Sequence, residues 1–334
     1  MERLLLLALA LLMAGCEILG TDAEPEASVR LDVPPGFAPV PEPAHNPITA
    51  AKVTLGEQLF FDPILSRDRT VSCGSCHLPD LAFSDPRPVS LGIEGRSGIR
   101  NSPSLVNIAY QNLFFWDGGA LTLENQVFGP LEDANEMDAD LAEILERLSA
   151  DPAYRQAFDR AFDEAPSLRG LTQALAAYQR TIRSGGSRYD RYQAGDEAAL
   201  TAAEKRGLTL FEGEARCATC HNGFLLSNRA FENNGLAFAN ADSGRARITH
   251  QPEDFGKFKV PSLRNVALTA PYMHDGRLPT LEAVIEHYDR GGTDARGQHP
   301  VIRPLNLTKA DKADLIAFLE SLTDASIRTG LDNP

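Results

Sequence analysis

Long apolar runs are almost absent from this sequence of 334 residues. The one near the start, residues 4–15, is too short to span a bilayer as a helix, so the body of the protein is expected to be soluble. Basic residues are also few, because 32 Lys and Arg stand against 46 Asp and Glu for a net charge of −14. Such an acidic chain is not expected to bind nucleic acid, whose phosphates need Lys and Arg. The negative charge would attract a basic soluble partner, but it is explained equally well as a means of keeping the protein in solution.

Cysteine is scarce as well, with five residues in the chain, yet four of them form two copies of one pattern. Residues 73–77 read Cys-Gly-Ser-Cys-His, and residues 217–221 read Cys-Ala-Thr-Cys-His. This pattern is the attachment signature of c-type haem, in which two thiols bond to the porphyrin and the histidine ligates the iron. The sequence therefore predicts two covalent haems. Their attachment residues are Cys73, Cys76 and His77 for the first, and Cys217, Cys220 and His221 for the second.

Two other uses of these cysteines are weighed. A four-cysteine zinc site would leave both histidines unexplained, and structural zinc pairs usually lie far closer in sequence than Cys76 and Cys217. A pair of disulfides is the second alternative. A two-residue gap between thiols fits redox chemistry better than a structural disulfide, and no thioredoxin-like pattern surrounds either pair.

The fifth cysteine, Cys16, follows the short apolar run. Residues 1–15 are predicted to be a signal peptide, and Leu12-Met13-Ala14-Gly15-Cys16 resembles a bacterial lipobox. Cleavage before Cys16 and acylation of its thiol would anchor the chain; ordinary secretion is the alternative. Residues 16–47, rich in Pro, Glu and Ala, are predicted to be a lipidated tether. Glu17 in place of Asp gives no inner-membrane retention signal, so we expect the periplasmic side of the envelope and an outer-membrane anchor.

Helical patterns dominate the rest of the chain. Apolar residues recur at helical spacing over residues 49–62, 138–150 and 167–183. Thr201–Glu204 and Thr308–Asp311 are capping patterns that open two more helices. Strand signals are few, and Gly185-Gly186 is the best central boundary. The predicted fold is mainly α, with two cytochrome c-like helical domains that each hold one covalent haem. Their predicted bounds are 48–185 and 186–325, followed by a tail, 326–334.

An internal repeat allows the two haems to be compared. Residues 103–107, Pro-Ser-Leu-Val-Asn, resemble residues 261–265, Pro-Ser-Leu-Arg-Asn, at an offset of 158. At this offset His287 and Tyr288, which can both ligate iron, pair with Gly129 and Pro130, which cannot. The second haem is therefore predicted to be closed by a side chain and the first to be open. Alternatively, both haems draw ligands from elsewhere, and the candidates are His45, His250, His274 and His299.

Polar residues follow the first-half turn at residues 116–118. A carboxylate such as Glu136 can move a proton between the two oxygens of peroxide, and Gln126 lies near it in sequence. Taken alone, Glu136 is better explained as a solvated charge near a helix start. Trp116, the only tryptophan, is by itself more often a core residue than a redox relay.

The motifs together resemble the bacterial diheme cytochrome c peroxidase family, including the branch of the methylamine dehydrogenase maturation enzyme MauG. The resemblance covers roughly residues 45–325. In the first half it rests on Leu65-Ser66, Arg100-Asn101-Ser102-Pro103-Ser104, Phe115-Trp116-Asp117-Gly118, Gly129-Pro130 and Glu136-Met137. In the second half it rests on Leu210-Phe211, Val260-Pro261-Ser262-Leu263-Arg264-Asn265 and Pro271-Tyr272-Met273-His274-Asp275-Gly276.

The resemblance implies a role for each site residue. The haem on His77 would be the peroxidatic centre, with Gln126 and Glu136 on its distal side. The haem on His221 would hold electrons, with Trp116 between the two haems. A calcium ion would take ligands from Asn101 and from the backbone carbonyls of Thr269 and Pro271.

Two departures from many family members bear on activity. Ile93 stands where those enzymes have a removable histidine ligand, and Tyr288 stands where they have methionine, as in the MauG branch. The resemblance thus implies an enzyme that reduces hydrogen peroxide, with electrons from a small c-type cytochrome or cupredoxin and without reductive activation. One alternative is MauG-like oxidation of a protein or organic substrate through a high-valent diheme state. Another is a non-catalytic diheme electron carrier.

Overall fold

The computed structural model describes residues 28–236, 242–293 and 296–330. The predicted signal peptide and the predicted lipidation site at Cys16 lie outside these residues. The described part is mainly helical, as predicted, and its sheet consists of two short antiparallel strands, β1 (Phe231–Glu232) and β2 (Phe258–Lys259). Within the same residues, no helix is long and apolar enough to cross a membrane.

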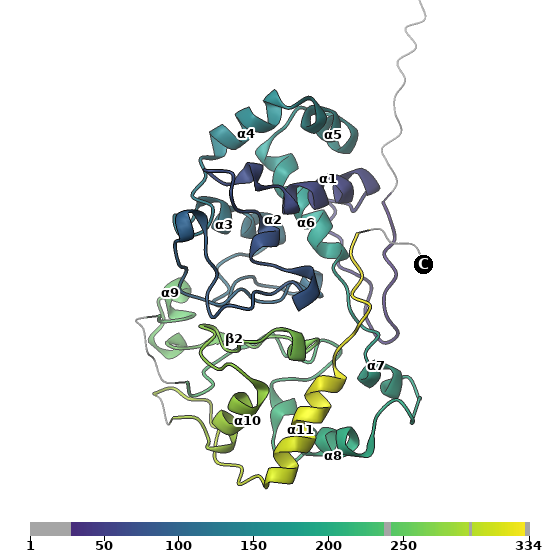
Figure 1. Ribbon diagram of the computed structural model, residues 1–334, viewed down its shortest axis with the longest axis vertical. Coiled ribbons are helices and arrows are strands. Elements are labelled where there is room, and N and C mark those ends of the chain that lie inside the picture. Colours follow the sequence, from purple (N-terminus) through teal and green to yellow (C-terminus); the bar gives the residue numbers. More distant parts are fainter. Residues whose placement is uncertain (1–27, 237–241, 294–295, 331–334) are drawn as a thin grey trace, which may run out of the picture.

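The helices gather in two lobes, each around its own apolar core (Figure 1). The upper lobe holds α1 (Ala50–Phe61), α2 (Leu123–Gln126), α3 (Phe128–Glu132), α4 (Leu141–Ala150), α5 (Pro152–Phe162) and α6 (Leu168–Thr181). The lower lobe holds α7 (Arg188–Gln193), α8 (Ala202–Glu212), α9 (Ala246–Thr249), α10 (Leu281–Asp289) and α11 (Lys309–Ser321).

Side-chain caps explain where most of these helices begin. Both predicted capping boxes are present, because Thr201 and Glu204 open α8, and Thr308 and Asp311 open α11. The helix expected from residue 138 begins later, at Leu141, because the Asp140 side chain accepts hydrogen bonds from the next backbone amides.

One glycine in each lobe lets two helices cross in close contact. Gly56 of α1 lies against the backbone of Ala174 in α6, and Gly207 of α8 lies against the backbone of Asp314 in α11. A Cβ at either glycine would overlap a carbonyl oxygen of the facing helix. Each lobe therefore contains one pair of helices that cross at a glycine.

The sequence repeat is also a structural repeat. Asn107 and Asn265 both have left-handed backbone, with φ of 59° and 60°. The bridge between residues 114 and 120 recurs between residues 272 and 278, and α2 and α10 begin at equivalent residues. In the upper lobe the helix is interrupted between α2 and α3. Pro130 explains the interruption, because a proline ring clashes with the carbonyl four residues earlier, which here belongs to Gln126.

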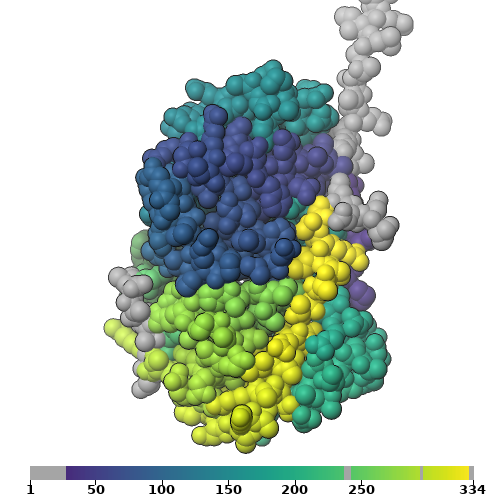
Figure 2. Space-filling view, in the orientation of Figure 1, coloured from purple at the N-terminus to yellow at the C-terminus, as the bar shows by residue number. Residues whose placement is uncertain are grey.

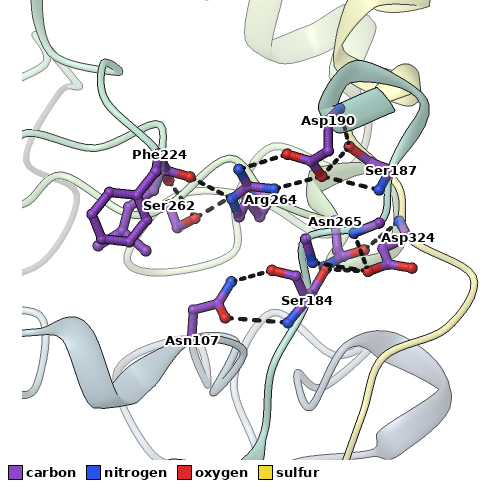
Figure 3. Close-up of polar contacts among 12 residues, drawn as sticks. Asn107, Ser184, Ser187, Asp190, Phe224, Ser262, Arg264, Asn265 and Asp324 are labelled. Atoms are coloured by element: carbon purple, nitrogen blue, oxygen red, sulfur yellow. Dashed lines mark hydrogen bonds and ion pairs between the residues drawn. The ribbon is translucent and has the colours of Figure 1, made fainter. Parts of the chain in front are cut away.

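The two equivalent asparagines meet at the junction of the lobes (Figure 3). The Asn107 side chain donates to the Ser184 carbonyl at 2.8 Å, and the Asn265 side chain donates to the Ser184 hydroxyl at 2.9 Å. The carboxylate of Asp324 accepts from the backbone amides of Gly185 and Gly186 at 2.9 and 2.8 Å. These buried contacts tie the connection between the lobes to both copies of the repeat.

Segments near both ends of the described chain also hold the lobes together. Residues 28–47, part of the predicted tether, lie against the body: Arg183 donates to the Asp32 carbonyl, and the Phe37 ring contacts Tyr110 edge-on and Phe224 at a tilt. Beyond α11 the chain returns to the upper lobe, where Arg328 pairs with Arg183 through two backbone hydrogen bonds. Figure 2 shows this segment in yellow across the junction. Apolar residues such as Leu31, which is buried in the upper core, explain why residues 28–47 are not extended into solvent.

Candidate haem sites

Both haem motifs open onto a single cavity of about 670 Å³, which is lined by residues of both lobes and is called the interlobe cavity below. Each motif begins with a short 3-10 turn, η2 (Cys73–Ser75) and η6 (Cys217–Thr219). The backbone amides of His77 and His221 donate to the carbonyls of Cys73 and Cys217 at 3.0 and 2.9 Å. These turns bring two thiols and one imidazole of each motif to the cavity wall.

The two histidines are held alike. Nδ1 of His77 lies 2.9 Å from the Phe83 carbonyl oxygen, and Nδ1 of His221 lies 3.1 Å from the Leu226 carbonyl oxygen. Burial lowers the pKa of His77, and it lowers the pKa of His221 to about 4. A neutral ring that donates through Nδ1 leaves Nε2 as the iron ligand, which is the usual arrangement of a metal-bound histidine.

The cysteines do not form the alternative sites. All four thiols are free, so neither pair is a disulfide. Among the described residues, no group of three or more histidine, cysteine or acidic side chains could hold a metal ion.

Two further polar groups on the cavity wall fit a bound cofactor. Nη1 of Arg216 and Oε1 of Gln111 are buried without a hydrogen-bond partner, and both residues line the interlobe cavity. A buried polar group without a partner is costly; a haem propionate would accept from Nη1 of Arg216 and, when protonated, donate to Oε1 of Gln111. Neither residue could be predicted from the sequence, because neither belongs to the attachment motif.

Glu136 and Gln126 lie on the cavity wall beside the first haem motif. The side chain of Glu136 is accessible through the cavity, yet desolvation by the surrounding protein raises its pKa to about 7, with the charge of Asp133 adding to the effect. The backbone of this segment is fixed, because the amide of Ile93 donates to the Glu136 carbonyl at 2.8 Å. Glu136 is therefore an exposed carboxyl on the cavity wall whose pKa the surrounding protein raises toward neutral pH.

Trp116 also lines the cavity, at the contact between the lobes. Its indole Nε1 donates to the Asn101 carbonyl at 2.8 Å, and its own carbonyl accepts from the Lys259 amide at 2.7 Å. The indole is thus anchored to the first half and the backbone to the second half.

Tyr288 and His287 are adjacent in α10, but only the Tyr288 side chain faces the interlobe cavity. Tyr288 lines the cavity, and burial raises the pKa of its phenol to about 12. His287 is 3% exposed, is not part of the cavity wall, and has Nε2 3.0 Å from the Asn234 carbonyl oxygen. The side chain of the same Asn234 donates to the Tyr288 hydroxyl at 3.4 Å. Asn234 lies in a loop without periodicity, so the sequence did not point to it.

The other candidate ligands divide into two groups. His45 and His250 are not part of the cavity wall, whereas His274 and His299 are. The His274 ring stacks on Phe258 with ring centres 3.7 Å apart, and Nδ1 of His299 accepts from the Val301 amide. Those two histidines are therefore engaged with the protein.

The three residues expected to bind calcium all lie on the wall of the interlobe cavity. Asn101, Thr269 and Pro271 all line the interlobe cavity, although they come from the two halves of the chain. The Asn101 amide donates to the His274 carbonyl at 2.8 Å, which ties these two segments to each other. Amide and carbonyl oxygens are ligands that calcium prefers.

Two haem-attachment turns around one cavity define a diheme c-type cytochrome. A family model described as di-haem cytochrome c peroxidase matches residues 50–198, and one described as cytochrome c matches residues 204–323. The chain belongs to the di-haem cytochrome c peroxidase family. Its two cytochrome c-type domains fit two covalent haems.

Curated relatives and solved structures agree with this placement. The chain is 41% identical to cytochrome-c peroxidase IdrP1 of Denitromonas iodatirespirans, over 85% of either protein. It is also 41% identical to methylamine utilization protein MauG of Methylorubrum extorquens, over 85% of this chain and 81% of the relative. A crystal structure of a MauG-like protein associated with microbial copper homeostasis matches with a TM-score of 0.85 at 40% identity. That match covers 90% of this chain and 97% of the other.

Proposed function

We propose that this protein is a peroxidase that reduces hydrogen peroxide to two waters, with two protons and with two electrons from a small c-type cytochrome. The observation that carries the proposal is the place of Glu136 on the cavity wall with Cys73, Cys76 and His77, where desolvation raises the pKa of its carboxyl to about 7. Peroxidase and MauG relatives at about 40% identity support the same reaction class. Steady-state turnover of peroxide with a reduced cytochrome tests it, and no turnover with any small donor would reject it.

The haem attached through Cys73 and Cys76 supplies the iron that binds peroxide and takes up its oxidising equivalents. The carboxylate of Glu136 accepts the proton of the oxygen nearer the iron and returns it to the oxygen that leaves as water. Gln126 lies on the same cavity wall and orients the two oxygens by hydrogen bonding. Pro130 and Gly129 occupy the repeat positions of Tyr288 and His287, and neither can ligate iron, so this side stays free for peroxide.

A haem held by Cys217, Cys220 and His221 would supply the electron store. Tyr288 would ligate it, because the phenol lines the cavity and His287 does not. Trp116 carries electrons between the haems, as supported by its anchoring to both halves. A calcium ion held by Asn101 and by the carbonyls of Thr269 and Pro271 would fix the contact between the lobes.

The electron donor and the location are part of the same proposal. A cupredoxin is the second candidate donor, and a basic face on either donor would suit a chain of net charge −14. We place the protein on the periplasmic side of the envelope, anchored through a lipid on Cys16 to the outer membrane. A Cys16→Ser variant that stays in the membrane fraction would contradict the anchor.

A second candidate function is oxidation of a protein or organic substrate, as in the MauG branch. Tyr288 on the cavity wall and the likeness to a MauG-like structure favour it. Turnover assays separate these two functions, because only a peroxidase is expected to reduce peroxide rapidly with electrons from a small redox protein. A pure electron carrier would show only low-spin ferric iron in both haems.

A further inference from the structure

Met273 lies beside Tyr288 on the wall of the interlobe cavity. The amide nitrogen Nδ2 of Asn234 is 3.2 Å from the Met273 sulfur and 3.4 Å from the Tyr288 hydroxyl oxygen. A thioether sulfur and a phenol oxygen are both atoms that ligate haem iron. Two potential ligands of the second haem therefore share one hydrogen-bond donor.

The internal repeat shows that these two positions face the cavity in both lobes. At the offset of 158, Met273 pairs with Phe115 and Tyr288 pairs with Pro130, and all four residues line the cavity. Met273 and Phe115 also share left-handed backbone, with φ of 79° and 63°. In the first half neither side chain can ligate iron, whereas in the second half both can.

His287 is a poorer substitute for Tyr288 than its place in the sequence suggests. Its ring is 3% exposed, and Nε2 is held by the Asn234 carbonyl at 3.0 Å. To reach the cavity this ring would have to break that contact and change places with Tyr288 on α10. The Met273 side chain, by contrast, is already on the cavity wall.

We infer that Met273 is a second iron ligand of the haem attached through Cys217 and Cys220, and that it binds the iron when Tyr288 leaves it. The inference rests on the proposed ligation by Tyr288. In the exchange an iron–oxygen bond breaks and an iron–sulfur bond forms, the phenolate leaves as a phenol with a proton from water, and the iron keeps its oxidation state. Because methionine raises the haem potential and an anionic oxygen lowers it, the two ligands give one haem two potentials.

The test compares the haem-loaded full chain as wild type, Tyr288→Phe, Met273→Leu and the double variant. Mass spectrometry first establishes that each carries two covalent haems. Optical and electron paramagnetic resonance spectra of the ferric proteins and the midpoint potential of the second haem are then measured. Phenylalanine and leucine keep the size of the replaced side chains, so packing changes are small.

Tyr288→Phe is expected to stay low-spin at the second haem, with the charge-transfer band of a thioether ligand and a higher potential than wild type. Met273→Leu alone is expected to keep the wild-type spectrum, and the double variant is expected to lose the band and become high-spin. A high-spin Tyr288→Phe protein, or one with the spectrum of a second histidine ligand, would overturn the inference about Met273 alone. A wild-type spectrum and potential in Tyr288→Phe would overturn the Tyr288 assignment of the proposed function, and the inference with it.

Discussion

The backbone amide of Ile93 donates a 2.8 Å hydrogen bond to the carbonyl oxygen of Glu136. Ile93 itself is fully buried, and its neighbour Gly92 lies against the backbone of residues 135–136. The loop in which many family members have a displaceable histidine thus supports the segment of the proposed proton shuttle. The proposed mechanism therefore needs no displacement of this loop before peroxide reaches Glu136.

Gly92→Ala should slow the reaction with peroxide. A Cβ at Gly92 would overlap the carbonyl oxygens of Asn135 and Glu136, so the segment must move. The matched control in the same loop is Gly98→Ala, whose Cβ would have its nearest neighbour, the Ser90 carbonyl oxygen, at 3.9 Å. Stopped-flow rates at equal haem content check this, and equal rates in Gly92→Ala and wild type would contradict the supporting role of the loop.

Glu136→Gln should slow the reaction of the ferric protein with peroxide by about 10²–10⁴, because general acid–base help of this kind is lost. Both haems should remain attached, since Glu136 is not part of either motif. Glu132→Gln, a change at an exposed residue of α3 outside the cavity wall, serves as the control. If Glu136→Gln reacts as fast as this control, another residue carries the proton.

The rate should depend on pH through the same carboxyl. Burial raises the pKa of Glu136 to about 7, so the carboxylate that accepts a proton is lost as the pH falls below 7. The peroxide reaction rate should therefore rise between about pH 6 and 8 and level off above. Asp133→Asn removes the nearby negative charge and should move the profile to lower pH, while burial still keeps it above the usual glutamate range. A profile that Asp133→Asn leaves in place would assign the titration to another group.

Gly207→Ala should destabilise the second lobe despite the better helix propensity of alanine. The new Cβ would overlap the backbone of Asp314 in α11. Overpacking of this severity should lower the free energy of unfolding by roughly 3 kcal/mol, the upper end of the usual range. The control is Ala313→Gly, at an exposed site of α11, which should cost about 1 kcal/mol through propensity alone. Denaturant unfolding measures both free energies, and a neutral Gly207→Ala would mean that the helices can move apart.

The sequence predicted the elements that have local signals. Both capping boxes, the helices now seen as α1 and α6, and the repeat at offset 158 are all present. It missed α5, which Asp151 and Pro152 open with ordinary cap chemistry but without a long apolar stripe. The contacts of residues 28–47 with both lobes could not be predicted, because they depend on surfaces that exist only after the lobes form.

In the site, too, the features with a sequence pattern could be predicted. The attachment turns follow from the fixed spacing of the motif, and the repeat alone showed that Tyr288, which can ligate iron, is equivalent to Pro130, which cannot. The raised pKa of Glu136 depends on desolvation by the folded protein, so the sequence alone favoured a solvated charge. The contacts of Asn234 with Met273 and Tyr288 join two loops and helix α10, which share no pattern in sequence.

The most direct test mixes the all-ferric, haem-loaded protein with hydrogen peroxide in a stopped-flow spectrometer. The first haem is proposed to be open as isolated, because Ile93 replaces the removable histidine and Pro130 cannot ligate. The spectrum should therefore change at once, at a rate proportional to peroxide concentration and without a reductant. A protein that reacts only after one haem has been reduced would contradict the proposal.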